Sequence, residues 1–277
     1  MRFRRSLPTH SASAPAGTVR RAGWAAAPAA LLALALALTG CTRVHTTSPS
    51  TVRQEAGTTG KGAFGSVDCR KAKCIALTFD AGPSKNTAKL LDVLKDKQVH
   101  ATFFLLGKKH VERYPDMVKR MAAEGHEVAS HTWSHKILPE IDPKEIREEL
   151  RRPDDAIERI TGRRPTLVRP PQGRTNDTVQ EIAREMGLSE VLWSVTAKDY
   201  ETSDSALITK RVLDQADRDG IILLHDVVPG PTSKGYRGTL KAVPDIIDAL
   251  KKRGFTFVTV PQLLAPGTPQ PGAVYRP

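Results

Sequence analysis

Two histidines that stand four residues apart, His131 and His135, have a spacing that suggests metal chemistry. They lie in the stretch SHTWSH, and on a helical turn this spacing would place both imidazoles on one face, where they could hold a divalent ion. The alternative is a solvated turn in which Trp133 packs inward. The metal interpretation is favoured because the pair follows a strand-like run, as Asp80 does.

Asp80 lies in the stretch LTFDAGPSKNT, where it follows an apolar run and precedes a Gly-Pro turn. This position makes it a candidate catalytic carboxylate. Farther along the chain, the stretch ILLHDV places His225 and Asp226 directly after an apolar run, and a histidine in this position is a candidate general acid. A second acid beside Asp80 is absent, because the next residue is Ala81.

A third stretch, VRPPQG, ends a predicted strand at Arg169 and continues with two prolines and a glycine. Prolines restrict the backbone, so the N–H groups of Gln172 and Gly173, after Pro171, could be held toward a ligand oxygen at little entropic cost. The alternative is an ordinary barrel loop, and this stretch by itself favours neither.

Apolar runs of strand length recur through the chain and alternate with stretches of helical spacing. Such alternation predicts an α/β fold in which helices cover a parallel sheet. An open sheet and a closed barrel fit it equally well. We favour the barrel, because polar residues that follow many strands can converge only if the sheet curls. The seven predicted strands are 75–79, 101–106, 127–129, 167–168, 191–195, 221–224 and 255–260.

Residues 1–40 are predicted to be a signal peptide, because five arginines precede the uncharged run 25–38. At about 1.5 Å per residue this run covers about 21 Å, which is short of the roughly 30 Å hydrocarbon core of a membrane. It ends in LTGC, which resembles the lipobox of bacterial lipoproteins, so we expect Cys41 to be acylated. The alternative is an ordinary secretory signal with an incidental cysteine.

Composition divides the rest of the chain into three parts. Residues 41–66 are rich in Thr, Ser and Gly without an apolar period, which predicts a flexible tether. Residues 67–265 are enough to form one domain with its own core. Residues 266–277 contain four prolines and two glycines, which predicts a loose C-terminal tail.

The chain is basic, with a formal net charge of +12. Removal of residues 1–40, which contain five arginines and no acids, lowers this charge to +7. A basic surface can bind nucleic acid, but an exported chain meets an anionic wall or membrane instead. We therefore expect an extracytoplasmic monomer, anchored to the membrane by lipid, with no nucleic-acid partner.

Two cysteines remain besides Cys41, namely Cys69 and Cys74. We expect them to form a disulfide, because disulfides persist in exported proteins. A loop this short contributes about 2 kcal/mol of stability in the chain-entropy model, so the bridge would mainly hold the entry to one strand. The C-x4-C spacing also permits metal binding, but zinc sites usually have a second pair nearby.

These motifs, in this order, resemble the NodB-type polysaccharide deacetylases, a family of carbohydrate esterases. The resemblance covers residues 73–260 and includes five separate motifs. It implies a distorted (β/α)7 barrel, a divalent metal ion that is commonly zinc, with cobalt as an alternative, and hydrolysis of N-acetyl or O-acetyl groups on glycans.

The resemblance also implies a role for individual residues. Asp80 resembles the catalytic base that takes a proton from the attacking water, and Arg169 resembles its charged partner, which favours the ionised carboxylate. His131 and His135 match the two metal-binding histidines. In the family a second aspartate completes the metal site, and Ala81 stands in its place.

The remaining motifs match the family less closely. His225 matches the general acid that protonates the departing amine, and Asp199 resembles the acid that holds this histidine. The backbone N–H of Gln172 would help to hold the oxyanion, although the family commonly has tyrosine there. Thr196 and Tyr200 replace residues that are often aspartate and tryptophan, which implies an altered substrate groove.

The expected function is therefore removal of N-acetyl groups from peptidoglycan sugars by a membrane-tethered, metal-dependent enzyme. Within the enzyme class, the alternative is an O-acetyl esterase acting on acetylated xylan. From a different class, the alternative is a non-catalytic, glycan-binding pseudoenzyme, because Ala81 cannot bind a cation.

Overall fold

The computed structural model describes residues 44–57, 67–227 and 235–277. The predicted signal peptide, 1–40, and the predicted lipidation site, Cys41, lie outside these residues. The described residues group into one compact unit. No helix in the described ranges is long and apolar enough to cross a membrane.

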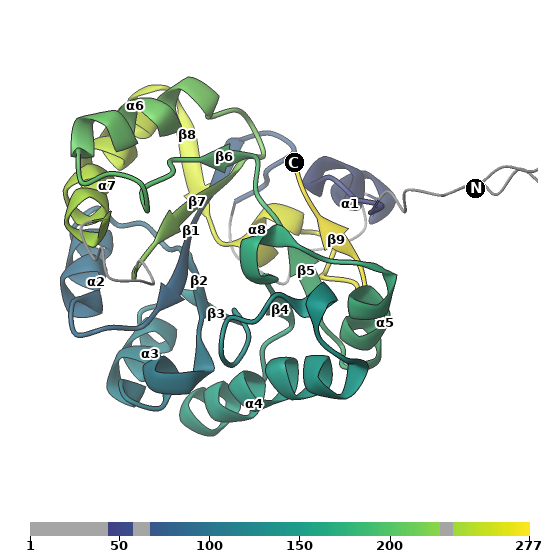
Figure 1. The fold of residues 1–277 in the computed structure, drawn as a ribbon. Helices are drawn as coiled ribbons and strands as arrows, with labels where there is room; N and C mark the ends of the chain where they lie inside the picture. Colours follow the sequence, from purple (N-terminus) through teal and green to yellow (C-terminus); the bar gives the residue numbers. More distant parts are fainter. Residues whose placement is uncertain (1–43, 58–66, 228–234) are drawn as a thin grey trace, which may run out of the picture. The chain divides into compact units, whose positions relative to one another are not determined.

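The strands pair in parallel within one curled sheet, which Figure 1 shows surrounded by helices. The central strand β1 (Lys73–Gly82) is buried from its second residue to its last, as is typical of parallel strands covered on both faces. The strand order is β6-β7-β1-β2-β3-β4-β5-β9, with β8 also paired to β1. The other strands are β2 (Thr102–Leu105), β3 (Glu127–Ser130), β4 (Leu167–Val168), β5 (Ser189–Val191), β6 (Val195–Thr196), β7 (Ile221–His225), β8 (Phe255–Val258) and β9 (Val274–Tyr275).

The sheet forms the predicted distorted barrel, but one predicted strand is wrong. The run 191–195 divides into two strands, since β5 ends at Val191 and β6 begins at Val195. Strand β5 pairs with β4, whereas β6 pairs with β7 on the other side of β1. Among the described strands β5 and β6 share no ladder, so residues 192–194 link the two sides of the barrel covalently.

Helices follow the strands and cover the outside of the barrel (Figure 1). The longest, α4 (Pro143–Thr161), begins where the Asp142 side chain accepts a hydrogen bond from the N–H of Glu145, and it ends at Gly162 in the left-handed conformation. The other α-helices are α1 (Pro49–Glu55), α2 (Thr87–Asp96), α3 (Pro115–Ala123), α5 (Asp177–Glu185), α6 (Ser205–Gln215), α7 (Gly235–Lys252) and α8 (Val260–Leu264), and the short turns are η1 (Gly107–Val111), η2 (Leu138–Glu140) and η3 (Pro171–Gly173).

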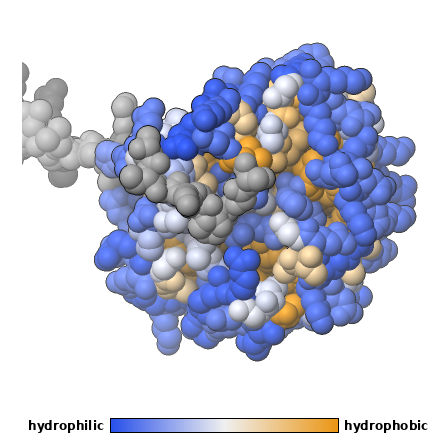
Figure 2. Space-filling model, turned by 180° about the vertical axis from the view of Figure 1, so that it is seen from behind, coloured by the Kyte–Doolittle hydropathy of each residue, from blue (hydrophilic) through white to orange (hydrophobic). Residues whose placement is uncertain are grey.

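The core lies between the helices and the sheet. The leucines whose helical spacing predicted α2, Leu90, Leu91 and Leu94, are all buried in it. Phe79 of β1 stacks on Phe103 of β2, with ring centroids 5.3 Å apart. Figure 2 shows that hydrophilic residues cover most of the rear face, with hydrophobic residues visible in the spaces between them. This packing holds the strand ends on which the polar motifs lie.

The predicted flexible tether, 41–66, is wrong for residues 49–55, which form helix α1. The Arg53 side chain is buried and donates hydrogen bonds to the Leu263 carbonyl oxygen at 2.6 Å and to the Asp219 carboxylate at 2.5 Å. Thr and Ser are common in linkers, but contacts with residues far along the chain hold this segment on the barrel. Residues 58–66 lie outside the described ranges.

The predicted loose tail is also wrong at its end. Val274 and Tyr275 form β9, which pairs with β5, and both side chains are buried. The Tyr275 hydroxyl accepts a hydrogen bond from the N–H of Gln270 at 2.7 Å. Prolines and glycines lower the local preference for strand structure, but the open edge of β5 supplies the missing hydrogen-bond partners.

A disulfide joins Cys69 and Cys74 just before and within β1. Both residues are fully buried in the part of the core that includes Val258 and Val260. The bridge therefore closes a short loop at the amino end of β1, at the opposite end of this strand from Asp80.

Candidate active site

A cavity of about 600 Å³ opens at the carboxyl ends of the strands. Seven residues that the sequence singled out for catalysis or binding line it, and they come from loops or strands far apart in the chain. This is the end at which α/β barrels build their sites. The lining residues are Asp80, His131, His135, Gln172, Trp193, Thr196, Tyr200, Leu223 and His225.

Asp80 forms a buried ion pair with Arg169 beneath this cavity. The guanidinium Nη1 lies 2.7 Å from Asp80 Oδ1 and also donates to the Thr78 hydroxyl at 2.8 Å. Its Nε donates to the Val191 carbonyl oxygen at 3.0 Å, and the guanidinium lies 4.0 Å from the centre of the Phe104 ring. These contacts compensate for the burial of a charge and fix the direction of the carboxylate.

The second carboxylate oxygen of Asp80 faces the histidine pair. Oδ2 lies 3.8 Å from His131 Nε2. The His131 Nδ1 lies 2.8 Å from the Arg169 carbonyl oxygen, which can only accept, so Nδ1 carries the proton and Nε2 has its lone pair available. Burial lowers the pKa of His131 to about 4 and also lowers the pKa of His135. Both imidazoles are therefore neutral at pH 7, the form that binds metal ions.

The predicted helical turn for the two histidines is wrong, although their proximity is correct. Residues 131–135 lie in a loop after β3, and the imidazole centres of His131 and His135 are 4.9 Å apart. Both Thr132, with φ of 71°, and His135, with φ of 65°, adopt the left-handed conformation. The Thr132 hydroxyl accepts a hydrogen bond from the His135 N–H at 3.1 Å. A strained loop, instead of helical periodicity, thus brings the rings together.

These two imidazoles are candidate metal ligands. Among the described residues no group of three His, Cys, Asp or Glu side chains could hold a metal ion. Ala81 occupies the position of the missing acid, and its side chain is buried with φ of 67°. The two imidazole nitrogens are ligands that a divalent ion such as zinc accepts, but a catalytic zinc site has three protein ligands, so this site is one ligand short.

Glu149 of α4 holds the histidine loop, and the sequence analysis missed it. Its carboxylate accepts hydrogen bonds from the Ser134 N–H at 2.8 Å and from the Ser134 hydroxyl at 2.6 Å. The signal was present in the sequence, because Glu149 interrupts the apolar face that Ile146 and Leu150 define. A buried acid on such a face needs a partner, and Ser134 is that partner.

Replacing Glu149 by alanine is expected to weaken zinc binding by about 10-fold, because groups that orient metal ligands commonly affect affinity by about 10- to 100-fold. Calorimetric titration of the full chain with zinc measures this. Glu148→Ala is the matched control, since its carboxylate is exposed and pairs with Arg151 on the same helix. Equal zinc affinities for the two variants, both folded by thermal unfolding, would contradict the role of Glu149.

His225 faces Asp80 across the cavity and is held by a buried carboxylate. Its Nδ1 lies 2.8 Å from Asp199 Oδ1, and its backbone N–H donates to Asp199 Oδ2 at 2.8 Å. The Thr239 hydroxyl also donates to Oδ2 at 2.7 Å. Burial lowers the pKa of His225, but the Asp199 charge and hydrogen bond outweigh it, so the net shift is upward. The protonated imidazole is thereby favoured, as a general acid requires.

The Asp199→Asn variant is expected to lower the pKa of His225, because it removes the charge that favours the protonated ring. NMR titration of the His225 imidazole measures this shift, and His126, which directly precedes β3, is the internal reference. In the native chain the pKa of His225 is raised on folding. The contribution of protonated His225 to the free energy of unfolding is therefore complete below about pH 6.5 and is lost as the pH rises through the raised pKa. An unchanged His225 pKa would refute the assignment.

The residues predicted to hold an oxyanion are only partly placed as expected. Gln172 lines the cavity with φ of 57°. The N–H of Gly173, however, donates to the Pro170 carbonyl oxygen at 2.9 Å and is not available to a ligand, which corrects that prediction. Pro171 is buried and, like Gly173, does not line the cavity. A side chain on Gly173 would meet the Trp193 ring, so this glycine permits the ring to pack there.

The sequence analysis also missed two lining residues, Trp193 and Leu223. Trp193 lies in the link between β5 and β6, which the prediction treated as part of a single strand. Tyr200, which the motifs had indicated as a groove residue, is exposed and meets the His225 ring edge-on, with centroids 5.5 Å apart. Aromatic rings beside the polar cluster provide a surface on which a sugar ring can stack.

Comparisons with known proteins agree with this site. The family model described as Polysaccharide deacetylase matches residues 68–191. The chain is 42% identical over 192 residues to the peptidoglycan-N-acetylmuramic acid deacetylase PdaC of Bacillus subtilis, covering 69% of this chain and 38% of the relative. It is 35% identical over 195 residues to a peptidoglycan-N-acetylglucosamine deacetylase of Bacillus cereus, covering 69% of this chain and 88% of the relative.

A solved structure described as T48 deacetylase with substrate has a TM-score of 0.70 and 37% identity, and the match covers 76% of this chain and all of that one. The chain spans about two fifths of the length of the first curated relatives that it matches. The region that the family model matches contains strands β1 to β5, with the motifs of Asp80, the histidine pair and Arg169. The chain belongs to the polysaccharide deacetylase family.

Proposed function

We propose that this protein removes acetyl groups from a cell-wall glycan, and specifically N-acetyl groups from peptidoglycan sugars. The observation that carries the proposal is the pair of opposed, separately held groups in one cavity: Asp80 on Arg169, and His225 on Asp199. Arg169 compensates the negative charge of Asp80, whereas the Asp199 charge raises the pKa of His225, which suits a base and an acid in one reaction. The names of the relatives, peptidoglycan deacetylases, support the choice of polymer.

In this proposal Asp80 accepts a proton from the water whose oxygen attacks the acetyl carbonyl carbon. The bond between that carbon and the sugar nitrogen then breaks, and His225 donates a proton to the departing amine. Acetate and a free amino sugar are the products. Arg169 holds Asp80 in place and keeps its negative charge compensated, while the backbone N–H of Gln172 is the proposed donor to the oxyanion.

The proposal includes a divalent ion, zinc first and cobalt as the alternative, which His131, through its Nε2 atom, and His135 would hold. When bound, such an ion supplies Lewis-acid polarisation of the acetyl carbonyl. Imidazole nitrogens suit both ions. Because Ala81 leaves the set one protein ligand short, we expect weaker metal binding than a site with a carboxylate would have.

Acetate release tests the proposal directly. The full chain, supplied with zinc or cobalt, is expected to release acetate from N-acetylated glycan strands, and His131→Ala is expected to abolish this dependence on added metal. Acetylated xylan is the second substrate, since the sequence leaves amide and ester substrates open. Release only from xylan would replace the proposed amidase with an esterase.

Ala81 favours one other candidate function, a glycan-binding pseudoenzyme. A chain that cannot hold the ion would keep the groove but lose the chemistry. Binding of glycan strands without release of acetate, under both zinc and cobalt, would establish this alternative and exclude the enzyme.

The proposed location is the outer face of the cytoplasmic membrane, with Cys41 acylated. The apolar run before the LTGC sequence supports this, and so does the disulfide, which suits an exported protein. Mass spectrometry of the mature N-terminus is expected to find a lipid-modified Cys41 and no residue before it. A mature chain that begins elsewhere without lipid would refute the anchor. We propose a monomer, and sedimentation of the detergent-solubilised chain measures its state.

A further inference from the structure

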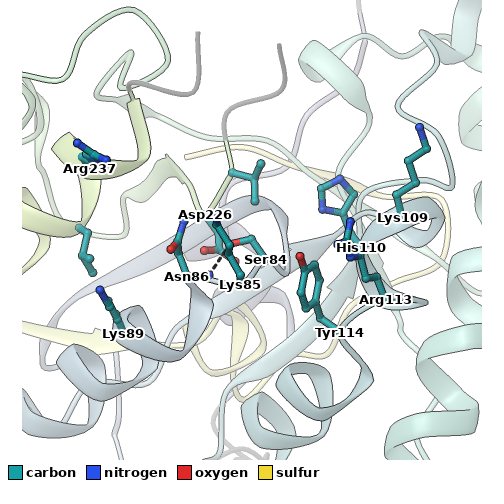
Figure 3. A pocket seen from close by; sticks show the side chains of 12 residues that line it. Ser84, Lys85, Asn86, Lys89, Lys109, His110, Arg113, Tyr114, Asp226 and Arg237 are labelled. Atoms are coloured by element: carbon teal, nitrogen blue, oxygen red, sulfur yellow. Dashed lines mark hydrogen bonds between the residues drawn. The ribbon is translucent and has the colours of Figure 1, made fainter. Parts of the chain in front are cut away.

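A second cavity, larger than the first at about 770 Å³, lies on the other side of the carboxyl end of β1. Figure 3 shows Asp226 near its centre, with Arg237 and Lys89 on one side and Lys109 and Arg113 on the other. Asp226 directly follows His225, which lines the candidate active site. The two cavities are therefore neighbours, joined through consecutive residues at the end of β7.

The lining of this second cavity is strongly basic. Five lysine and arginine side chains surround it, and none of them forms an ion pair with a described residue, whereas Arg147, Arg151 and Arg184 on α4 and α5 do. They come from three separate segments: α2 and the residues before it, η1 with the turn after it, and the first turn of α7. These cations are Lys85, Lys89, Lys109, Arg113 and Arg237.

The positive character comes from these side chains and not from the backbone. Helix α2 begins at Thr87, and residues before it and in its first turn line the cavity. The first N–H groups of this helix already have partners, since the Asn86 N–H donates to the Ser84 hydroxyl and the Thr87 N–H donates to the Ser84 carbonyl oxygen. The five cations therefore carry the attraction for an anion.

Asp226 provides the polar floor of the cavity. It is fully buried, its Oδ2 accepts a hydrogen bond from the Thr87 hydroxyl at 2.5 Å, and its Oδ1 has no partner among the described residues. Burial raises the pKa of Asp226 to about 7, so near neutral pH much of this acid is protonated. The protonated form carries no negative charge, so it opposes the binding of an anion less than an ionised carboxylate would.

We propose that this basic pocket binds the phosphate groups of a phosphodiester-linked cell-wall polymer, beside the site that acts on the glycan. A single carboxylate would leave most of the five cations unpaired, whereas successive phosphates along a polymer can engage several of them. The choice of a wall polymer rests on the proposed function, but phosphate binding itself does not. The pocket thus places the enzyme on an anionic polymer next to its substrate.

Calorimetric binding of a poly(glycerol phosphate) oligomer to the full chain tests this proposal. The Lys89→Ala/Arg113→Ala variant removes cations from two sides of the pocket and is expected to weaken binding by about 10-fold. The matched control is Lys95→Ala/Lys144→Ala, which removes two exposed cations away from the pocket and is expected to bind like the native chain. Raising the salt from about 50 to about 200 mM is expected to weaken native binding more than binding of the pocket variant.

The proposal would be overturned if the native chain did not bind the phosphate oligomer, or if the pocket variant and the control lost the same affinity for it. It would also be overturned if the pocket variant lost as much affinity for a poly-glutamate oligomer or for phosphatidylglycerol vesicles. Acetate release from a short, uncharged acetylated oligosaccharide is measured in parallel and is expected to be the same in all forms. If no form releases acetate but the phosphate oligomer still binds through the pocket, the proposed enzymatic function is wrong and the proposed phosphate-binding site is confirmed.

Discussion

Replacing Asp80 by asparagine is expected to reduce acetate release by at least about 100-fold, because a positioned general base contributes about 10²- to 10⁴-fold. The amide cannot take the proton from water at neutral pH. Its side-chain oxygen can still accept the hydrogen bond that Arg169 donates to Asp80 Oδ1 at 2.7 Å, so the geometry is largely kept. The loss should therefore appear in kcat more than in KM.

A matched control separates chemistry from folding. Asp92→Asn removes an exposed carboxylate of α2 that pairs with Arg120, and this variant is expected to leave acetate release unchanged. Urea unfolding of both variants is required, because removing one charge of a buried pair commonly costs about 3–5 kcal/mol. If folded Asp80→Asn keeps its native rate, Asp80 is not the base.

The Ala81→Asp variant is expected to strengthen zinc binding by about 10- to 100-fold or more, since a direct ligand should matter at least as much as the groups that orient ligands. The backbone favours the change. Ala81 has φ of 67°, and aspartate adopts this left-handed conformation more readily than alanine does. Its buried carboxylate would also be compensated by the bound ion.

Zinc titration and acetate release together test this prediction. Ala81→Asn has the same shape without the charge and is expected to show a smaller gain in affinity. Tighter zinc binding does not require faster turnover, because an ion held more firmly can retain the acetate product. If Ala81→Asp and His131→Ala both leave zinc affinity and acetate release unchanged, the metal site proposed here does not exist.

The sequence alone determined most of the site, because its chemistry is carried by short motifs at strand ends. Asp80 and His225 each end or follow a run that is apolar enough to be recognised as a buried strand, and His131 follows another. Parallel strands bring their carboxyl ends to one edge of the sheet, so motifs remote in sequence could be predicted to meet. Residue type then indicated the chemistry of each.

The tertiary structure alone decided the features that depend on partners far along the chain. The run 191–195 divides into β5 and β6 because its halves pair with different strands, which local composition cannot reveal. Residues 49–55 and the C-terminal end look like linkers but are held by Asp219 and by the open edge of β5. Periodicity and motifs report local preference, whereas burial and hydrogen bonding between distant segments are set only when the chain packs.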